Sequence, residues 1–302
     1  MADEITTTLL TSNGGLEAAV LSDLLVSQLY DATDLTAVMT RIPWQPAGGQ
    51  GLDVTKDAVP GAFAHVTPEG SDVGANSAYT TSKYTLTPAR YARRYQLTDL
   101  IPITGARIGL EEVANKLVQG VALTMTDLLT ALFTSVASSV GNATTAVSVD
   151  TIFDAAFQLN NEANQGTFSC VLYPDQMNNF RSSLRAESGA VQFREVTYET
   201  LRARGSGYQG FWSGIDFWQS DSVPLSTSRQ GCMFGYGAFA YTMADPRVIN
   251  GMISSDNIIF ANELMLLERD RNAVAAMTTL IGNIYPAVVE AEDLRACRVL
   301  SS

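Results

Sequence analysis

Histidine and cysteine are scarce in this chain of 302 residues. His65 is the only histidine, while Cys170, Cys232 and Cys297 lie far apart and form no CxxC pair. Zinc clusters and disulfide frameworks need several such residues at fixed spacings, so neither is predicted. The cysteine pattern favours a reducing compartment.

Recognisable catalytic motifs are also missing. The sequence contains neither a phosphate-binding P-loop nor a Gly-x-Ser-x-Gly nucleophile motif. His65 lies between Ala64 and Val66 with no Asp or Ser motif beside it, and we interpret it as a structural residue. We therefore predict no enzyme activity and no catalytic, cofactor-binding or metal-binding residues.

Basic residues are few relative to acidic ones. The chain has 19 Lys and Arg against 31 Asp and Glu, which gives a formal net charge of −12. Groove-type binding of nucleic acid needs a basic patch, so the charge argues against it, although not against enclosing nucleic acid. The hydrophobic fraction of 46% is enough for a substantial core, and the length suggests one or two domains.

Long apolar runs are missing as well. No uninterrupted apolar stretch reaches the length needed to span a bilayer. Asp3 and Glu4 occupy the place of the basic residues of a signal peptide, and Glu17 and Asp23 interrupt the apolar segment that follows. We therefore expect neither a secretory signal nor a membrane partner.

The N-terminal segment is purely acidic. Residues 1–40 contain six acidic residues and no Lys or Arg. Apolar residues from Leu16 to Leu29 recur at helical spacing, which predicts a short amphipathic helix in an N-terminal arm. Pro43, Pro46 and the glycine-rich run after them break regular structure.

The segment from Ala64 to Leu100 predicts an exposed β-arm. Aromatic and β-branched residues alternate in the chain after Tyr79, a period-two pattern that is typical of strands. One strand from Tyr79 to Leu97 would reach roughly 60 Å at about 3.3 Å per residue, which overhangs a body of this size. An isolated ribbon of two strands is barely stable in water, so we expect a partner chain to cover it.

Residues 110–138 give the clearest helix. Apolar residues recur at intervals of three and four from Leu110 to Val136. Glu111 and Glu112 lie in the first turn, where negative charge suits the helix dipole. At about 1.5 Å per residue, this helix would span roughly 43 Å.

Further elements are predicted towards the C-terminus. Val149 starts a helix that ends near Gly166, and Pro174 opens another helix in the position where its missing N–H costs little. Residues 186–210 are polar and indicate a mobile loop. Strands are predicted at 168–173, 257–277 and 280–286.

Several of these motifs together resemble one protein family. The order Thr67–Gly70 (TPEG), Lys83–Arg90 and Gln96–Asp99, followed by a long helix, is similar to the extended loop and spine helix of the major capsid proteins of tailed bacteriophages. The segment CVLYPDQMNNFRSSL at 170–184 is similar to the central segment of that family's axial domain. The stretch Gly210–Trp218 resembles the family's Gly-x-x-x-Gly strand, and Gly231–Tyr241 resembles the strand after it. Encapsulins and the herpesvirus capsid floor share the same fold.

The resemblance implies an α+β fold in four parts. These parts are an N-terminal arm at 1–42, an extended β-hairpin loop at 43–97, a peripheral domain at 98–147 and 245–280 with the spine helix, and an axial domain at 148–244 and 281–302. It also implies self-assembly, through pentamers and hexamers, into the icosahedral shell around a phage's double-stranded DNA. Portal, scaffolding and decoration proteins would be further partners, and the shell would be assembled in the host bacterial cytoplasm and located in the virion.

Charged residues of the arm and the loop are candidate contacts between subunits. The set consists of Asp23, Asp31, Asp34, Glu69, Lys83, Arg90, Arg93 and Arg94. Tyr91 and Tyr95 interleave with the arginines, a pattern that nucleic-acid-binding surfaces also use, but the net charge favours pairing with the acidic arm of another subunit. The arginines could instead pair within their own subunit, for example with Asp99.

Two other functions stay open at this stage. An encapsulin-type nanocompartment has the same fold but encloses cargo enzymes, so recovery of cargo rather than DNA would favour it. A soluble hydrolase is the alternative from another class. The absence of a nucleophile–histidine constellation speaks against the hydrolase.

Overall fold

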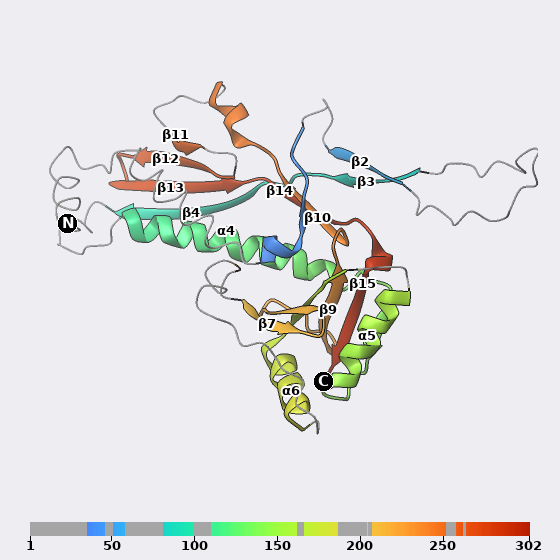
Figure 1. Ribbon diagram of the computed structural model, residues 1–302. Helices are drawn as coiled ribbons and strands as arrows, with labels where there is room; N and C mark the ends of the chain where they lie inside the picture. Colours follow the sequence, from blue (N-terminus) through green and yellow to red (C-terminus); the bar gives the residue numbers. More distant parts are fainter. Residues whose placement is uncertain are drawn as a thin grey trace, which may run out of the picture.

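The fold consists of two lobes arranged along one long helix (Figure 1). A computed structural model describes residues 35–45, 51–57, 81–98, 110–161, 166–186, 204, 207–251, 258–261 and 264–302. Helix α4 (Leu110–Leu132) lies under the upper lobe and reaches the lower lobe with its C-terminal half. Helices and strands are mixed, which confirms the predicted α+β class. No helix in these described ranges is long and apolar enough to cross a membrane.

An antiparallel sheet forms the upper lobe. Its described strands are, in spatial order, β11 (Ile258–Ala261), β12 (Leu266–Asn272), β13 (Met277–Ile284) and β4 (Tyr91–Thr98). Leu267 and Leu280 pack from this sheet against Leu117 of α4. A methyl group at Gly282 would lie 2.9 Å from Leu117 Cδ2, so glycine lets the Leu117 side chain pack close to the sheet.

A smaller sheet links the two lobes. It contains β1 (Thr40–Arg41), β10 (Phe239–Met243) and β14 (Pro286–Glu290), with β10 in the middle. From β14 the chain continues through the short helix η3 (Asp293–Arg295) into the last strand, β15 (Ala296–Ser301). The chain therefore passes from the upper to the lower lobe directly beside the C-terminal end of α4.

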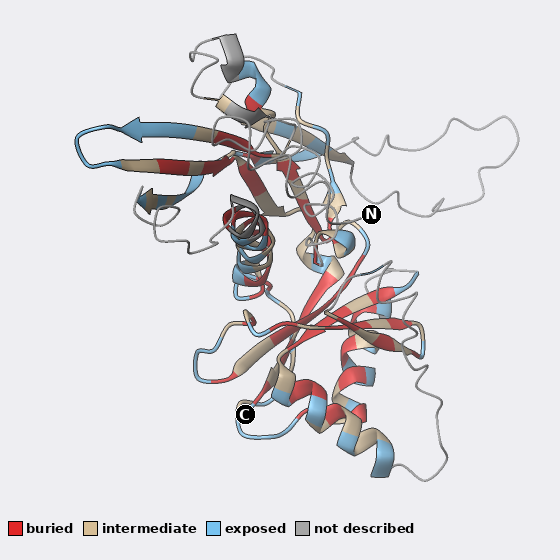
Figure 2. Ribbon diagram, turned by 90° about the vertical axis from the view of Figure 1, so that its left-hand side faces the viewer, coloured by how far each residue is buried: buried red, intermediate tan, exposed pale blue. Residues whose placement is uncertain are grey.

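A mixed sheet forms the centre of the lower lobe. Its described strands are, in spatial order, β5 (Ser139–Gly141), β15, β9 (Arg229–Gly235), β6 (Phe168–Leu172), β8 (Ile215–Gln219) and β7 (Tyr208–Trp212). Helices α5 (Val149–Asn161) and α6 (Pro174–Ala186) cover one face, and α4 covers the other. In β6, Cys170 packs towards α5 and α6 while Val171 packs towards α4. Burial on both faces explains the nearly continuous apolar sequence of β6, and Figure 2 shows buried residues concentrated in this sheet.

Aromatic residues fill both sides of the lower sheet. On the α6 side, the Phe180 ring stacks on Phe217 with centroids 4.7 Å apart and meets Trp212 edge-on. On the α4 side, Phe133 packs against Phe239. Each such pair contributes about 0.5–1.5 kcal/mol beyond the burial of its area.

The spine helix is shorter than the sequence predicts. The predicted helix ran from 110 to 138, but α4 ends at Leu132. The hydroxyl of Thr134 donates to the Ala131 carbonyl, and that of Ser135 donates to the Leu132 carbonyl. These bonds give hydrogen-bond donors to carbonyls at the end of the helix, which have no partner further along it. Val136 keeps its predicted burial in a non-helical segment that leads into β5.

The predicted single strand from Tyr79 to Leu97 is wrong. Within the described residues it is divided into β3 (Thr81–Leu86) and β4, which pair with different sheets. Pro88 lies in the break, where the Ala89 N–H donates to the Pro286 carbonyl. Proline has no N–H for a strand ladder, which explains the break. Because β4 belongs to the upper lobe, the overhanging arm is shorter than predicted.

Two other boundaries differ from the prediction. The predicted strand at 257–277 is a pair of strands, β11 and β12, followed by a turn before β13. The predicted loop at 186–210 gives way to β7 at Tyr208, and 187–203 lies outside the described residues. The predicted helix at Val149, the strand at 168–173 and the helix at Pro174 are confirmed, although α5 ends at Asn161 rather than near Gly166.

Candidate assembly surfaces

A β-ribbon projects from the body at the junction of the two lobes (Figure 1). It consists of β2 (Leu52–Asp57) and β3, which pair antiparallel from Leu52 opposite Leu86 to Asp57 opposite Thr81. Leu86, only 1% exposed, anchors its base in the body, whereas most of β3 is exposed. No further strand pairs with the ribbon among the described residues. Two strands alone are marginally stable in water, so this surface is suited to a partner.

The ribbon carries a local charge pair. Lys83 donates to Asp53 Oδ2 at 2.8 Å, and the Thr85 hydroxyl donates to the other carboxylate oxygen at 2.5 Å. The hydrogen bond from Lys83, and then that from Thr85, lowers the pKa of Asp53, while the same ion pair raises the pKa of Lys83. The pair is largely exposed to solvent, so it fixes the two side chains more than it stabilises the fold.

A second ion pair joins the ribbon to the body. Lys56 of β2 forms a salt bridge with Glu292, in the segment between β14 and η3. Glu292 is the more buried of the two side chains. This bridge, together with Leu86, sets the direction in which the ribbon leaves the body.

The three arginines of the predicted basic cluster are separated by the strand. Arg90 Nε donates to Asn283 Oδ1 at 2.9 Å. Arg93 lies against α4: its Nη1 is only 3.4 Å from the position that a methyl group at Gly120 would occupy. Its guanidinium also lies 5.4 Å from the centroid of the Tyr95 ring. Arg94 is on the opposite face of β4, since side chains alternate along a strand. The structure therefore gives Arg90 and Arg93 contacts within their own chain.

The acidic candidates for contacts between subunits are not among the described residues. Asp23, Asp31, Asp34 and Glu69 are outside the described residues, as are Asp99, His65 and the arm helix at 16–29. Lys83 is described and is paired with Asp53 of the same chain. Contacts of all these residues with another subunit stay a prediction.

The hairpin of β12 and β13 is a feature that the sequence analysis missed. The turn at 273–276 connects the two strands, and the outer ends of the hairpin project past α4, which Figure 2 shows end-on. Residues Arg269–Ala276 are all exposed. The alternating charges of Glu268–Arg271 (ERDR) indicate an exposed segment, but 273–276 contains neither glycine nor proline to signal the turn.

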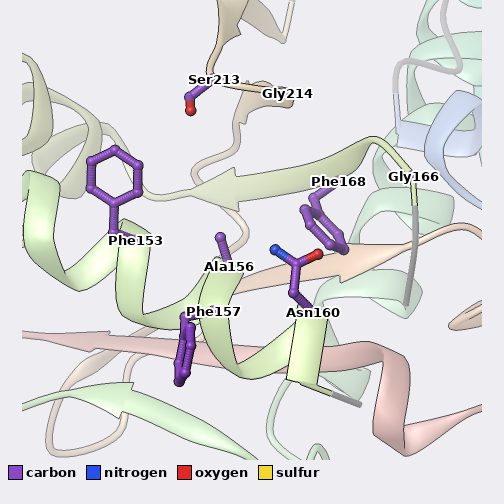
Figure 3. Close-up of a pocket in the computed structure, with 8 residues that line it drawn as sticks. All are labelled: Phe153, Ala156, Phe157, Asn160, Gly166, Phe168, Ser213 and Gly214. Atoms are coloured by element: carbon purple, nitrogen blue, oxygen red, sulfur yellow. The ribbon is translucent and has the colours of Figure 1, made fainter. Parts of the chain in front are cut away.

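A small pocket opens between α5 and the turn that joins β7 to β8. Its volume is about 320 Å³, and Figure 3 shows Phe153 pointing towards that turn. The lining residues are Phe153, Ala156, Phe157, Asn160, Gly166, Phe168, Ser213 and Gly214. None of them is an acid, a base or a thiol, so this pocket contains no group suited to proton transfer.

The three cysteines have no nucleophilic character. All of them are free and buried, in β6, β9 and β15. Burial raises the pKa of the Cys170 and Cys232 thiols strongly and that of Cys297 to about 11, which keeps them protonated. Among the described residues, no group of three His, Cys, Asp or Glu side chains is placed to hold a metal ion.

Comparison with known proteins identifies the fold. No protein-family model and no curated protein matches the sequence. Solved structures do match over most of the chain. The head of Helicobacter pylori bacteriophage KHP40 is similar with a TM-score of 0.62 at 10% identity, over 90% of this chain and 91% of that chain. The capsid of the cyanophage P-SCSP1u has a TM-score of 0.60 at 12% identity, over 90% and 89%.

Encapsulin structures are similar to almost the same degree. The holo-SrpI encapsulin complex from Synechococcus elongatus PCC 7942 has a TM-score of 0.57 at 12% identity, over 88% of this chain and 86% of that chain. The chain therefore has the capsid fold that phage heads and encapsulins share, which confirms the resemblance inferred from its motifs.

Proposed function

We propose that this chain is a major capsid protein of a tailed double-stranded DNA bacteriophage, whose copies assemble into a closed icosahedral shell. One observation carries the proposal: the chain matches phage capsid structures over about nine-tenths of both lengths.

The surfaces described above support assembly. The ribbon of β2 and β3 and the hairpin of β12 and β13 both project from the body and are exposed near their ends. Each contact made by such a narrow element is weak. In a closed symmetric shell the contacts are repeated, so that weak interfaces add up to a stable particle.

The charge of the chain fits a container for DNA. A net charge of −12 gives no general attraction to phosphates, so the shell would enclose the genome without binding particular sequences. Assembly would take place in the host bacterial cytoplasm, and the mature protein would be part of the virion. Portal, scaffolding and decoration proteins would be its partners, and we propose no enzyme activity for it.

We also propose a division into functional parts. Residues 1–42 would form the N-terminal arm and 43–97 the extended loop. The peripheral domain would comprise 98–147 and 245–280, and the axial domain 148–244 and 281–302. The peripheral part would then contain all of α4 together with β5, and the axial part α5, α6 and the other strands of the lower sheet.

An encapsulin-type nanocompartment is the second candidate. The observation that favours it is the encapsulin match, whose TM-score and coverage are close to those of the phage capsids. The fold does not distinguish the two functions, because both types of shell have it. What the particles enclose, DNA or cargo enzymes, does distinguish them.

Electron microscopy of the purified chain tests both proposals. Closed particles are expected from the chain alone or with its scaffolding partner, and only small discrete species at high concentration across salt and pH would contradict a shell function. Particles isolated from the native source are then digested with nuclease and analysed by mass spectrometry. Protected double-stranded DNA supports a phage capsid, and a co-purified enzyme supports a nanocompartment.

A further inference from the structure

Helix α5 exposes two phenylalanine rings to the solvent. The residues that it buries in the core of the lower lobe are Ile152, Ala155 and Leu159, each at most 1% exposed. Phe153 is 46% exposed and Phe157 is 70% exposed. One exposed apolar side chain is ordinary in a folded protein, but residues four apart are neighbours on a helix surface, so these two form a patch. The core of the lower lobe does not account for this patch.

The pocket between α5 and the turn from β7 to β8 opens beside these rings (Figure 3). The centroid of the Phe153 ring lies 5.0 Å from that of Trp212, so the core residue Trp212 supports this wall of the pocket. Phe157 and Asn160, further along α5, also line it. With a volume of about 320 Å³, the pocket has room for an apolar side chain of a partner.

The same part of α5 is acidic. Asp150 and Asp154 are exposed, and each precedes one of the two phenylalanines by three positions. Helix α5 contains no Lys or Arg, and neither aspartate forms an ion pair with another described residue. The spacing places a carboxylate beside each ring. A complementary surface would therefore carry basic residues on both sides of an apolar stripe.

The described α-helices of this chain do not offer such a surface. Their basic side chains are Lys116 of α4 and Arg181 and Arg185 of α6. Arg181 Nη2 donates to Gln209 Oε1 at 2.8 Å, and α6 has no large apolar side chain among its exposed residues. The sequence of the N-terminal arm, 1–40, contains no Lys or Arg. A second copy of this chain therefore fits the patch less well than a different protein does.

We infer that this face of α5 is a docking site for a basic amphipathic helix of a separate protein that binds the shell. We call it the α5 face, and it consists of Asp150, Phe153, Asp154, Phe157 and Asn160. An apolar side chain of the partner helix enters the pocket, and its Lys and Arg residues meet the two aspartates, as when a helix binds in a groove. The inference goes beyond the shell function and does not depend on what the shell encloses.

A designed peptide tests the α5 face directly. The probe is a fluorescein-labelled helical peptide of about 18 residues, with leucines at intervals of three and four and lysines on both sides of them. A scrambled peptide of the same composition has no apolar stripe and serves as the control. Binding to the whole chain is measured by fluorescence anisotropy at one fixed ionic strength, because salt screens contacts between exposed charges. If the wild-type chain binds both peptides equally well, the inference is overturned.

Removal of one ring tests the apolar part of the contact. Phe157→Ala is expected to weaken binding of the probe peptide at least about tenfold, because an anchor residue is lost. Tyr236→Ala, in the turn between β9 and β10, removes another exposed ring and is expected to keep the wild-type affinity. Circular dichroism confirms that both variants are folded. A Phe157→Ala variant that binds the probe like the wild type overturns the inference.

Charge reversal tests the electrostatic part. The double variant Asp150→Lys with Asp154→Lys is expected to bind the probe at least about tenfold more weakly, and to bind a peptide in which glutamates replace the lysines. Asp127→Lys with Asp270→Lys, at exposed positions outside the α5 face, gives the same net charge and is expected to keep the wild-type affinity for the probe. Equal losses in the two double variants would show that only net charge matters, and would overturn the docking site.

A cysteine at the pocket locates the peptide and tests whether a second copy covers the α5 face. The native cysteines are all buried, so in Asn160→Cys the new thiol is the reactive one. Its reaction with a maleimide is expected to slow when the probe binds, and an unchanged rate overturns the inference. Without the probe, particles and free subunits are expected to react equally fast.

Slow labelling of particles alone would mean that a second copy covers this face, which overturns the inference and leaves the shell function intact. A chain that forms no particles contradicts the shell function instead, and the peptide measurements on the free chain still decide the docking site.

Discussion

The hydroxyl of Ser135, just beyond the end of α4, donates a hydrogen bond of 2.7 Å to Glu290 Oε2 at the end of β14. This bond connects the spine helix to the strand from which the chain crosses between lobes. Asp293 lies beside Glu290 and accepts a bond from the Ala137 N–H at 2.8 Å. The second oxygen of Glu290 is buried with no hydrogen-bond partner.

Glu290 is expected to make the stability of this junction depend on pH. Burial, and then the neighbouring Asp293 carboxyl, raises the pKa of Glu290 above its ordinary value of 4.5. The folded state therefore holds this proton more tightly than the unfolded chain. The stabilisation is complete below the ordinary pKa and is lost as the pH rises through the raised folded value.

Urea denaturation of the wild type and of Glu290→Gln measures this effect. The amide keeps the shape and stays neutral, so the variant is expected to gain unfolding free energy relative to the wild type as the pH rises above the ordinary pKa of 4.5. Asp221→Asn, at an exposed turn of the lower lobe, serves as the matched control. A difference between Glu290→Gln and the wild type that is constant with pH would refute the role assigned to Glu290.

The packing of α4 against the upper sheet is expected to contribute strongly to stability. Leu117 is 3% exposed and touches the backbone of β13 at Gly282, so Leu117→Ala is expected to cost about 2–5 kcal/mol of unfolding free energy. Leu123, on the same helix, is 53% exposed, and Leu123→Ala is the matched control with a small expected effect. Equal losses in the two variants, measured by chemical denaturation, would show that the helix face has been assigned wrongly.

Patterns with a strong local cause were predictable from the sequence. The proline at the start of α6 and the apolar run of β6 placed those elements correctly. The turn after Asn272 was not predictable in the same way, because it contains neither glycine nor proline, and Ala276 takes a positive φ that the Asn272 side-chain bonds support. The strand break at Pro88 was visible in the sequence, but the regular alternation on both sides of it suggested one strand.

The arginine cluster shows a different limit of the sequence. Arg93 and Arg94 are adjacent in the chain, so they look like one patch, yet a strand places them on opposite faces. Arg93 lies near Gly120 of α4, and this contact between distant segments is not visible in any local sequence pattern.

Gln176 is expected to be essential to the lower lobe. It is fully buried, and its amide donates to Val299 O at 3.1 Å and to Ser301 Oγ at 2.9 Å, while its oxygen accepts from the Tyr173 N–H. Gln176→Leu leaves these buried groups unpaired, at an expected cost of about 1–3 kcal/mol each. Thermal unfolding measures the loss, with the exposed Asn178→Leu as the control on the same helix. A Gln176→Leu variant as stable as the wild type would mean that the amide network contributes nothing.

The ribbon is expected to serve assembly and not folding. Replacing residues 53–85 with a short Gly-Ser linker keeps its base at Leu52 and Leu86, so the unfolding temperature of the body is expected to change little. Particles are expected to disappear. Normal particles from this variant, seen by electron microscopy, would remove the ribbon from the assembly surfaces, and an unfolded chain would make it part of the core.

The last prediction separates Arg93 from Arg94. Arg93 packs on α4 and Tyr95, so Arg93→Glu is expected to lower the unfolding free energy by about 0.5–1 kcal/mol through the lost cation–π contact alone. Arg94 is exposed on the other face, so Arg94→Glu is expected to leave stability unchanged. If Arg94 meets the acidic arm of another subunit, the same change places like charges together, which can cost several kcal/mol at an interface, and assembly fails.

Compensating changes in the arm decide whether that contact exists. Lysine substitutions at Asp23, Asp31 and Asp34, added to Arg94→Glu, are expected to restore part of the assembly, because the two charges are then exchanged across the interface. The same lysines in the wild-type background place like charges next to Arg94 and are expected to impair assembly. Sedimentation of the variants against the wild type measures both effects. If the arm substitutions restore nothing while every variant stays folded, Arg94 acts within its own subunit, and the pairing between arm and strand must be abandoned.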